Sequence, residues 1–244
     1  MFRNGENMEI LLDMHTHTLA SGHAYSTIAE VAAAAAEQGL CAVGITEHAP
    51  TMPGTCHAFY FSNLKVLPRE MSGVEMFFGV ELNILDSDGN IDLSEALLKE
   101  MDIVIASLHL PCFAKGAEKE DYTNAYLKVM ENPYVNIIGH PDDGRIPVDY
   151  EKIVQAAAKY GKILEVNNSS LTPGGFRQNA RENQHMILEL CKKYQVPVTL
   201  SSDAHVDSDV GNVRYSLEVV EECGFPEELI VNTSVEKLRK YIGK

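Results

Sequence analysis

LLDMHTHTLASGHAYST, residues 11–27, runs from an apolar segment directly into a cluster of imidazoles. His15, His17 and His23 fall within nine positions. Alternate side chains of a strand share a face, so His15 and His17 point the same way, and the Ser21-Gly22 turn brings His23 back toward them. Histidine is the commonest zinc ligand, but this stretch alone fits a polar strand end with solvated imidazoles equally well.

Short apolar runs alternate with longer amphipathic runs along the rest of the chain. The apolar runs predict seven strands, at residues 9–14, 41–46, 76–82, 102–108, 135–139, 162–166 and 196–200. Helical patterns fall between most of them, at residues 26–38, 93–100, 121–131, 149–160, 179–194 and 210–223. The segment 47–74 is rich in proline and glycine and is expected to be mostly a loop. Seven strands that are apolar on both faces, with helices between most of them, predict a parallel sheet covered by helices. This sheet is either a closed barrel or an open doubly wound sheet.

The polar residues at the strand ends favour the barrel. Nearly every predicted strand carries a possible metal ligand at its C-terminal end: His15 and His17, His48, Glu81, His109, His140, and Asp203 with His205. The sixth strand ends in Glu165-Val166-Asn167-Asn168. In an α/β barrel these ends converge on one rim, where active sites lie, whereas the edge strands of an open sheet lie too far apart to share a cluster. We therefore predict a single-domain α/β barrel of the TIM-like type with seven strands.

This placement predicts a metal site. Seven of the nine histidines lie at or just past strand ends, whereas His57 and His185 do not and are interpreted as ordinary polar residues. The candidate ligands are His15, His17, His23, His48, Glu81, His109, His140, Asp203 and His205. A catalytic zinc usually takes three protein ligands, so nine suit three metal ions, or two with spare groups. Imidazole mixed with carboxylate selects zinc, manganese or iron.

Composition excludes several classes of function. The formal net charge of −15 argues against nucleic-acid binding, and no run of apolar residues is long enough for a membrane span. The five cysteines form no CxxC pair and, with no signal region at the N-terminus, predict a cytoplasmic protein with reduced thiols. Bound divalent cations would supply the local positive charge that an anionic substrate needs.

Six short segments of the chain resemble motifs of the PHP (polymerase and histidinol phosphatase) domain. In chain order they are DMHTHT, TEH, GVELN, SLH, IGHPD and SSDAH. EVNNSS and the HxH…GH opening are most similar to its YcdX-like branch of stand-alone phosphatases. The resemblance implies a distorted (β/α)7 barrel over residues 9–244, behind an N-terminal extension of residues 1–8. Glu47 stands where many members have Asp, and as an acid at the rim or behind the ligands it is expected to matter little.

The resemblance also implies three divalent ions, usually zinc, and assigns their ligands. The first ion would take His15, His17, Glu81 and Asp203, the second His23, His48 and His205, and the third His109 and His140, with Glu81 bridging it to the first. We expect a phosphoric monoester hydrolase whose nucleophile is a metal-bound hydroxide. Glu81 and Asp203 are the expected catalytic residues.

Substrate contacts are predicted on loops that leave the same rim. Asn167, Asn168 and Ser169 follow the sixth strand, and Arg145 and Arg177 are cations positioned to grip a phosphate. The alternatives are surface ion pairs for the arginines and loop caps for the asparagines.

Other functions are compatible with the same residues. The alternatives are a histidinol-phosphate phosphatase, a metal-dependent hydrolase of another ester or an amide, and a non-enzymatic metal-binding regulatory module. The expected partner is a small phosphorylated substrate, with no nucleic acid and no membrane, and the sequence predicts no oligomeric state.

Overall fold

Seven parallel strands form one continuous sheet in the computed structural model, which describes residues 8–243. They are β1 (Leu12–Thr16), β2 (Ala42–His48), β4 (Val74–Asn83), β5 (Ile103–Ser107), β6 (Ile137–Ile138), β7 (Ile163–Asn167) and β8 (Val198–Ser201). Each pairs with the next in chain order, and a bridge between Thr16 and Ala204 brings the two edges together. All seven predicted strands are found, and the predicted nearly closed TIM-like barrel in one domain is confirmed. Most of the predicted extension, residues 1–7, lies outside the described residues.

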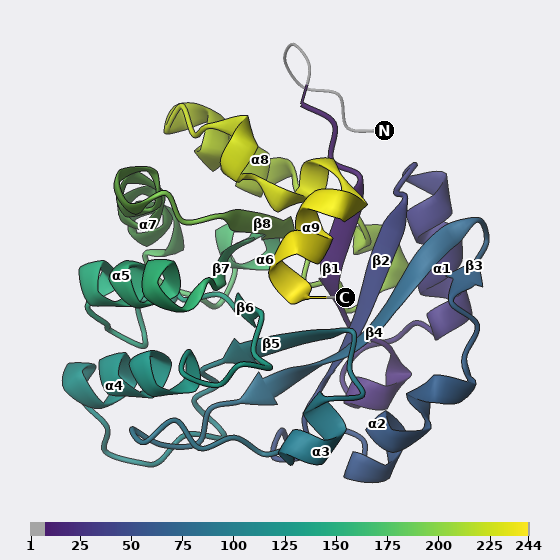
Figure 1. Cartoon of the computed structure of the whole chain (residues 1–244), viewed down its shortest axis with the longest axis horizontal. Coiled ribbons are helices and arrows are strands. Elements are labelled where there is room, and N and C mark those ends of the chain that lie inside the picture. The colour runs from purple at the N-terminus through teal and green to yellow at the C-terminus, as the bar shows by residue number, and fades with distance from the viewer. Residues whose placement is uncertain (1–7, 244) are drawn as a thin grey trace.

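Helices surround this barrel (Figure 1). The six predicted helices are found as α1 (Ile28–Glu37), α3 (Glu95–Leu98), α4 (Lys119–Val129), α5 (Tyr150–Tyr160), α7 (Ala180–Tyr194) and α8 (Arg214–Glu222). In Figure 1, α4, α5 and α7 lie along one side of the sheet and α1 lies on the other. Their buried faces are apolar, as with Ile153, Val154 and Ala157 of α5, because each helix covers the outside of the barrel.

Several elements were not predicted. The expected loop at 47–74 contains the helix α2 (Ala58–Asn63) and the short strand β3 (Glu70–Met71), which pairs antiparallel with β4. Two further helices are α6 (Asn168–Leu171) and α9 (Val235–Ile242). None of the helices within residues 8–243 is long and apolar enough to cross a membrane.

Two glycines keep the barrel narrow beneath its C-terminal rim. A Cβ atom on Gly44 would lie 2.7 Å from the carbonyl oxygen of Met14, and one on Gly79 would lie 2.1 Å from that of Ile103. Both distances are far below van der Waals contact, so any side chain here would push neighbouring strands apart. Gly79 lies two residues before Glu81 on the same face of β4, so this close approach of strands places Glu81 near the barrel axis.

The opposite end of the barrel is closed by apolar packing. Leu12, Phe77 and Ile163 belong to one buried cluster inside the barrel, which also contains Leu238 and Ile242 of α9. Figure 1 shows α9 lying across the barrel in this view. Because this end is filled and dry, the C-terminal rim is left as the end at which polar side chains gather.

A buried asparagine, Asn232, bonds to both strands at the seam between β1 and β8. The Nδ2 atom of Asn232 donates to the carbonyl oxygens of Leu12 at 2.8 Å and Leu200 at 2.7 Å. Its Oδ1 accepts from the Leu200 amide at 2.8 Å, and its carbonyl oxygen accepts from the Leu11 amide at 2.9 Å. Asn232 thus supplies hydrogen-bond partners to backbone groups that have no partner on the neighbouring strand.

Asn232→Ala should therefore destabilise the fold. It leaves three buried backbone groups of Leu12 and Leu200 unpaired, each at a cost of about 1 kcal/mol or more, so we expect the free energy of unfolding to fall by at least about 3 kcal/mol. Urea unfolding followed by circular dichroism measures this. Asn124→Ala, at an exposed position of α4, is the control and should change stability by less than about 0.5 kcal/mol. A loss below about 1 kcal/mol for Asn232→Ala would contradict the role of this residue at the seam.

Candidate metal centre

All nine predicted ligands meet at the C-terminal rim. His15 lies on β1, His48 ends β2 and Glu81 lies on β4. The others follow their strands directly: His17 and His23 after β1, His109 after β5, His140 after β6, and Asp203 with His205 after β8. Their rings and carboxylates form one contiguous cluster. The fold thus brings together residues from β1 through to the end of β8.

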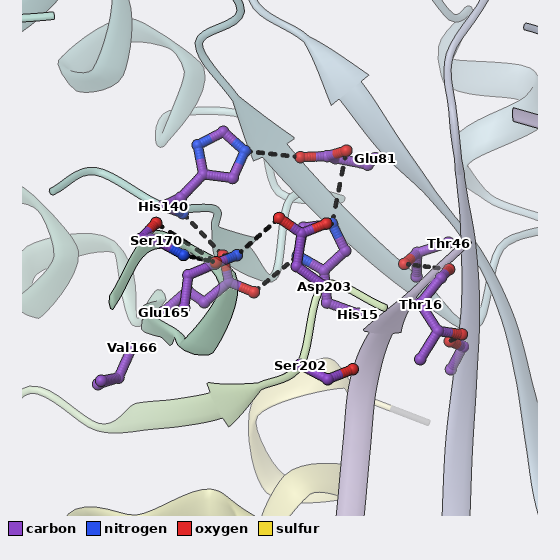
Figure 2. Close-up of polar contacts among 12 residues, drawn as sticks. His15, Thr16, Thr46, Glu81, His140, Glu165, Val166, Ser170, Ser202 and Asp203 are labelled. Atoms are coloured by element: carbon purple, nitrogen blue, oxygen red, sulfur yellow. Dashed lines mark hydrogen bonds and ion pairs between the residues drawn. The ribbon is translucent and has the colours of Figure 1, made fainter. Parts of the chain in front are cut away.

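Glu81 lies at the centre of this cluster and is fully buried. Its Oε2 atom faces three imidazoles, at 3.4 Å from Nε2 of His15, 3.5 Å from Nε2 of His17 and 2.6 Å from Nδ1 of His48. Its Oε1 atom faces two others, at 3.3 Å from Nε2 of His109 and 3.0 Å from Nε2 of His140. Figure 2 shows His15 and His140 reaching different oxygens of this carboxylate. The two oxygens therefore serve separate groups of histidines.

Three sets of donor atoms lie close enough to hold an ion, each set within 4.8 Å. They are His15, His17 and Asp203; His17, His48 and His205; and His48, Glu81 and His109. The grouping differs in part from the expected one, since His17 joins the second set in the place expected for His23. The ring of His23 instead packs at 4.9 Å from that of His48 and 5.0 Å from that of His205. His140 reaches the cluster through Glu81.

Hydrogen bonds orient four of the imidazoles. Each uses its Nδ1 atom: His15 to Glu165 at 2.7 Å, His17 to Ser21 at 3.2 Å, His109 to Asn83 at 2.8 Å, and His205 to the Asp203 carbonyl at 2.9 Å. Because Nδ1 donates in these bonds, the Nε2 atom of each ring faces the cluster, and it carries a lone pair when the ring is neutral. This arrangement is typical of metal-binding histidines, whose other nitrogen is held by a protein acceptor.

The arrangement of donor atoms in the cluster suits bound metal ions better than a network of hydrogen bonds. Nδ1 of His48 and Oε2 of Glu81 are both buried and lie 2.6 Å apart, yet neither has a hydrogen-bond partner. The Nε2 atoms of His15 and His17, both oriented as lone-pair donors, approach to 3.1 Å. Lone pairs at such distances repel unless a cation lies between them. The donor set of imidazoles and carboxylates suits zinc, manganese or iron.

The charges of the cluster also favour a cation. Burial raises the pKa of Glu81, but the neighbouring charges of His109 and His15 hold that pKa well below its usual range. Burial, together with the charges of His48 and His205, holds the pKa of His17 well below its usual value. Glu81 is thus an anion and His17 a neutral imidazole with an available lone pair, which are the protonation states that metal binding requires.

Glu165 positions two ligands and was missed as a site residue. It is fully buried, and its carboxylate accepts from Nδ1 of His15 at 2.7 Å and from the backbone amide of His140 at 2.7 Å. Figure 2 shows this carboxylate between the two histidines. His140 has a φ of +28°, and the bond to Glu165 helps to hold that unusual backbone. The signal in the sequence was a carboxylate inside the apolar strand KILEV.

Glu47 lies behind the candidate ligands, in one of the two positions expected for it. It is fully buried and accepts from the Thr18 amide at 3.0 Å and from the Ser21 hydroxyl at 2.5 Å. The Ser21 oxygen in turn contacts Nδ1 of His17 at 3.2 Å and accepts from the His48 amide at 3.1 Å. Glu47 therefore fixes the turn that carries two candidate ligands.

The two predicted asparagines cap helices that begin at the rim. Asn167 accepts from the Ser170 amide at 2.9 Å at the start of α6, and its Nδ2 donates to Asp203 at 3.1 Å. Asn168 accepts from the amides of Tyr215 at 2.8 Å and Ser216 at 3.3 Å, at the start of α8. Both side chains are buried and bonded to protein groups, which fits the alternative of loop caps considered for them.

The other three predicted substrate residues line a cavity of about 590 Å³ beside the cluster. Ser169 lies on its wall. Arg177 has a buried side chain that donates to Asp203 at 3.3 Å. Arg145 forms a bidentate ion pair with Asp143, as in the alternative considered for it. Arg177 is thus the cation nearest the candidate ligands, while the charge of Arg145 is already compensated.

The two remaining histidines lie outside the cluster, as predicted. His57 caps α2, where its Nδ1 accepts from the Phe59 amide at 3.3 Å. His185 pairs with Glu222 at 2.9 Å on the exposed surface. Neither residue lies near the candidate ligands.

The chain matches the family model of the PHP domain over residues 13–171. A probable phosphatase of Thermoanaerobacter sp. (strain X514) is 47% identical over 235 residues, covering 96% of this chain and 95% of the relative. A probable phosphatase of Acetivibrio thermocellus is 41% identical over 237 residues and is covered to 97%. The crystal structure of histidinol phosphate phosphatase from Lactococcus lactis, complexed with zinc, L-histidinol and phosphate, is similar with a TM-score of 0.60 and 18% identity, covering 89% of this chain and 95% of that one. This last likeness concerns the fold alone.

Proposed function

We propose, because this chain belongs to the PHP domain family, that it is a phosphoric monoester hydrolase that works with divalent metal ions at the barrel rim. One observation carries the proposal. Nine imidazole and carboxylate side chains meet at the C-terminal rim, and the oriented rings turn lone pairs toward two ionised carboxylates. The probable phosphatases that match nearly the whole chain support the same reaction class.

We propose three ions, with zinc preferred and manganese or iron as alternatives. The first would be held by His15, His17, Glu81 and Asp203, the second by His23, His48 and His205, and the third by His109 and His140 with Glu81 shared. The separate groups of histidines on the two oxygens of Glu81 support its bridging role. When bound, such ions supply Lewis acidity for the phosphoryl oxygens and lower the pKa of a coordinated water toward neutrality.

The protein groups supply orientation and charge. Burial raises the pKa of Asp203, but His15, a bond to His17 and the nearby Arg177 hold that pKa well below its usual range. Asp203 is therefore an anion that can orient an attacking water, and we propose that it also accepts the proton of that water. Asn167 and Arg177 bind its Oδ2 atom at 3.1 Å and 3.3 Å, which leaves Oδ1 toward the cluster. The buried guanidinium of Arg177 also adds fixed positive charge for a phosphoryl group.

The proposed substrate is a small phosphorylated molecule, in the cytoplasm. A cavity of about 590 Å³ is in the range of small-molecule sites. The net charge of −15 disfavours nucleic acid. Histidinol phosphate belongs in any substrate panel, together with sugar phosphates and nucleotides. An acetate ester and an anilide in the same panel test the alternative of ester or amide hydrolysis.

The first test is the metal content of the purified protein. We expect close to three transition-metal ions per chain by elemental analysis, because the cluster offers too many ligands for a single ion. Hydrolysis of p-nitrophenyl phosphate should be lost on chelation and recovered with Zn²⁺ or Mn²⁺. About one ion per chain under replete conditions would contradict the three-ion site. Three ions without hydrolysis of any phosphomonoester would favour the metal-binding regulatory module.

A further inference from the structure

The cavity beside the cluster has two different walls. One wall consists of candidate ligands, including His109, His140 and His205. The other is formed by loops after β5 and α6 and carries Leu110, Pro111 and Phe176. A phosphoryl group at the cluster leaves the second wall to the alcohol part of the ester. That wall therefore determines which alcohols fit.

The second wall carries exposed apolar side chains. Leu110 and Phe176 are 41% and 66% exposed, among only eight large apolar side chains with high exposure within residues 8–243. Exposed apolar groups that border a cavity gain free energy when a ligand covers them. Their position on this cavity, in a chain with a net charge of −15, points to an apolar ligand surface.

Two arginines hold the ring of Phe176 in place. The guanidinium carbon of Arg145 lies 4.8 Å from the ring centroid, and that of Arg177 lies 5.1 Å from it. Arg145 is fixed by its ion pair with Asp143, and Arg177 by its bonds to Asp203. The aromatic side chain is thus positioned before ligand binding, which lowers the entropy lost when a ligand packs on it.

The charges on this wall disfavour a second phosphate. Asp143 already neutralises Arg145, and Asp209 adds an exposed carboxylate to the cavity lining. A substrate with a distal phosphate would meet that carboxylate without an uncompensated cation nearby. The uncharged hydrogen-bonding side chain on this wall is Ser169, which offers one hydroxyl to a polyhydroxylated sugar.

We infer that the substrate is a monophosphate ester of an alcohol with a flat aromatic ring, which packs against Phe176 and Leu110 while the phosphoryl group lies at the cluster. The inference rests on the proposed phosphatase activity and specifies its substrate class. A free arylalkyl alcohol and a nucleoside share this chemistry. Phe176 is then a specificity-determining residue.

Benzyl phosphate and glucose 6-phosphate test this inference, because both are esters of primary alcohols. We expect kcat/KM to be up to about tenfold higher for benzyl phosphate, since an aromatic contact is worth up to about a factor of ten. Adenosine 5′-monophosphate distinguishes a nucleoside from an arylalkyl alcohol as the alcohol part of the substrate. A higher kcat/KM for adenosine 5′-monophosphate than for benzyl phosphate would identify a nucleoside. Equal kcat/KM for the ring-bearing esters and glucose 6-phosphate would overturn the inference while leaving the phosphatase proposal intact. Failure to hydrolyse any of these esters or p-nitrophenyl phosphate would instead overturn the proposed function.

Variants of Phe176 make the test specific. Phe176→Ala should lower kcat/KM for the preferred aromatic ester about tenfold, mostly through KM, and change that for methyl phosphate less than about twofold. Phe176→Tyr keeps the ring and should retain the preference. Phe59→Ala, which removes an exposed aromatic residue from α2, is the matched control and should change neither. An equal loss of kcat/KM for both substrates in Phe176→Ala would show that Phe176 supports the loop and does not select the substrate.

Discussion

Replacing Glu81 with glutamine should lower kcat for phosphomonoester hydrolysis by at least about 10³-fold, with a folded barrel retained. The carboxylate lies within 3.5 Å of five imidazoles, on both of its oxygens. Glutamine keeps the shape but removes the charge, and its NH₂ group cannot accept an ion. Two proposed ion positions therefore weaken together. Elemental analysis should show a loss of more than one metal ion per chain.

Glu75→Gln is the matched control for this experiment. Glu75 lies on the same strand, β4, but its partner is Arg239 on the partly exposed surface. The control should keep its metal and its turnover. Near-normal turnover of Glu81→Gln with a full complement of metal would show that another group bridges the ions. Loss of the circular dichroism signal would indicate that the negative charge of Glu81 is needed for folding. Thermal melts of the metal-free proteins would separate this effect on folding from the effect on metal binding.

The candidate ligands could be predicted because parallel strands end at one rim. Apolar runs locate each strand, and the first polar residue after a run is then a rim residue, as with His109 after β5 and His140 after β6. The same apolar runs gave the number of strands in the barrel. Neither conclusion depends on the exact end of an element, so errors of a few residues at strand ends did no harm.

The supporting residues could not be predicted because their partners lie far away in sequence. Glu165 acts on His15 from 150 positions away, and Asn232 acts on Leu12 from 220 positions away. The sequence around such a carboxylate or amide contains no pattern that predicts which distant residue it contacts. The helix α9 was missed for a related reason, since its role is to fill an end of the barrel that only the closed sheet defines.

Asn167 and Asn168 show that a correct location can leave the role of a residue open. Both lie at the end of β7, as expected for rim residues. The chain turns into α6 at that point, so Asn167 caps the new helix and Asn168 binds the start of α8. A polar residue at a strand end can therefore serve the backbone of the next element as readily as a ligand.

Asp203→Asn should separate catalysis from metal binding at the end of β8. Asp203 and His205 lie two residues apart, and Asp203 contacts His15 and His17 whereas the ring of His205 packs against His17 and His23. Asparagine keeps an oxygen donor in the place of Asp203 but loses the negative charge that orients a water and accepts its proton. We expect Asp203→Asn to retain most of its metal and to lose about 10²–10⁴-fold in kcat, the usual contribution of a general base.

His205→Ala provides the contrast, because it removes a proposed ligand and leaves Asp203 in place. It should lose one ion selectively and recover part of its activity in excess Zn²⁺ or Mn²⁺, whereas added metal should not rescue Asp203→Asn. Metal content and turnover must be measured on the same samples of both variants. Asp203 has a backbone φ of +56°, in the left-handed region that asparagine also tolerates, so the substitution adds little strain. If Asp203→Asn keeps both its metal and its full rate, Asp203 neither orients the water nor accepts its proton, and the proton must pass to another group at the rim.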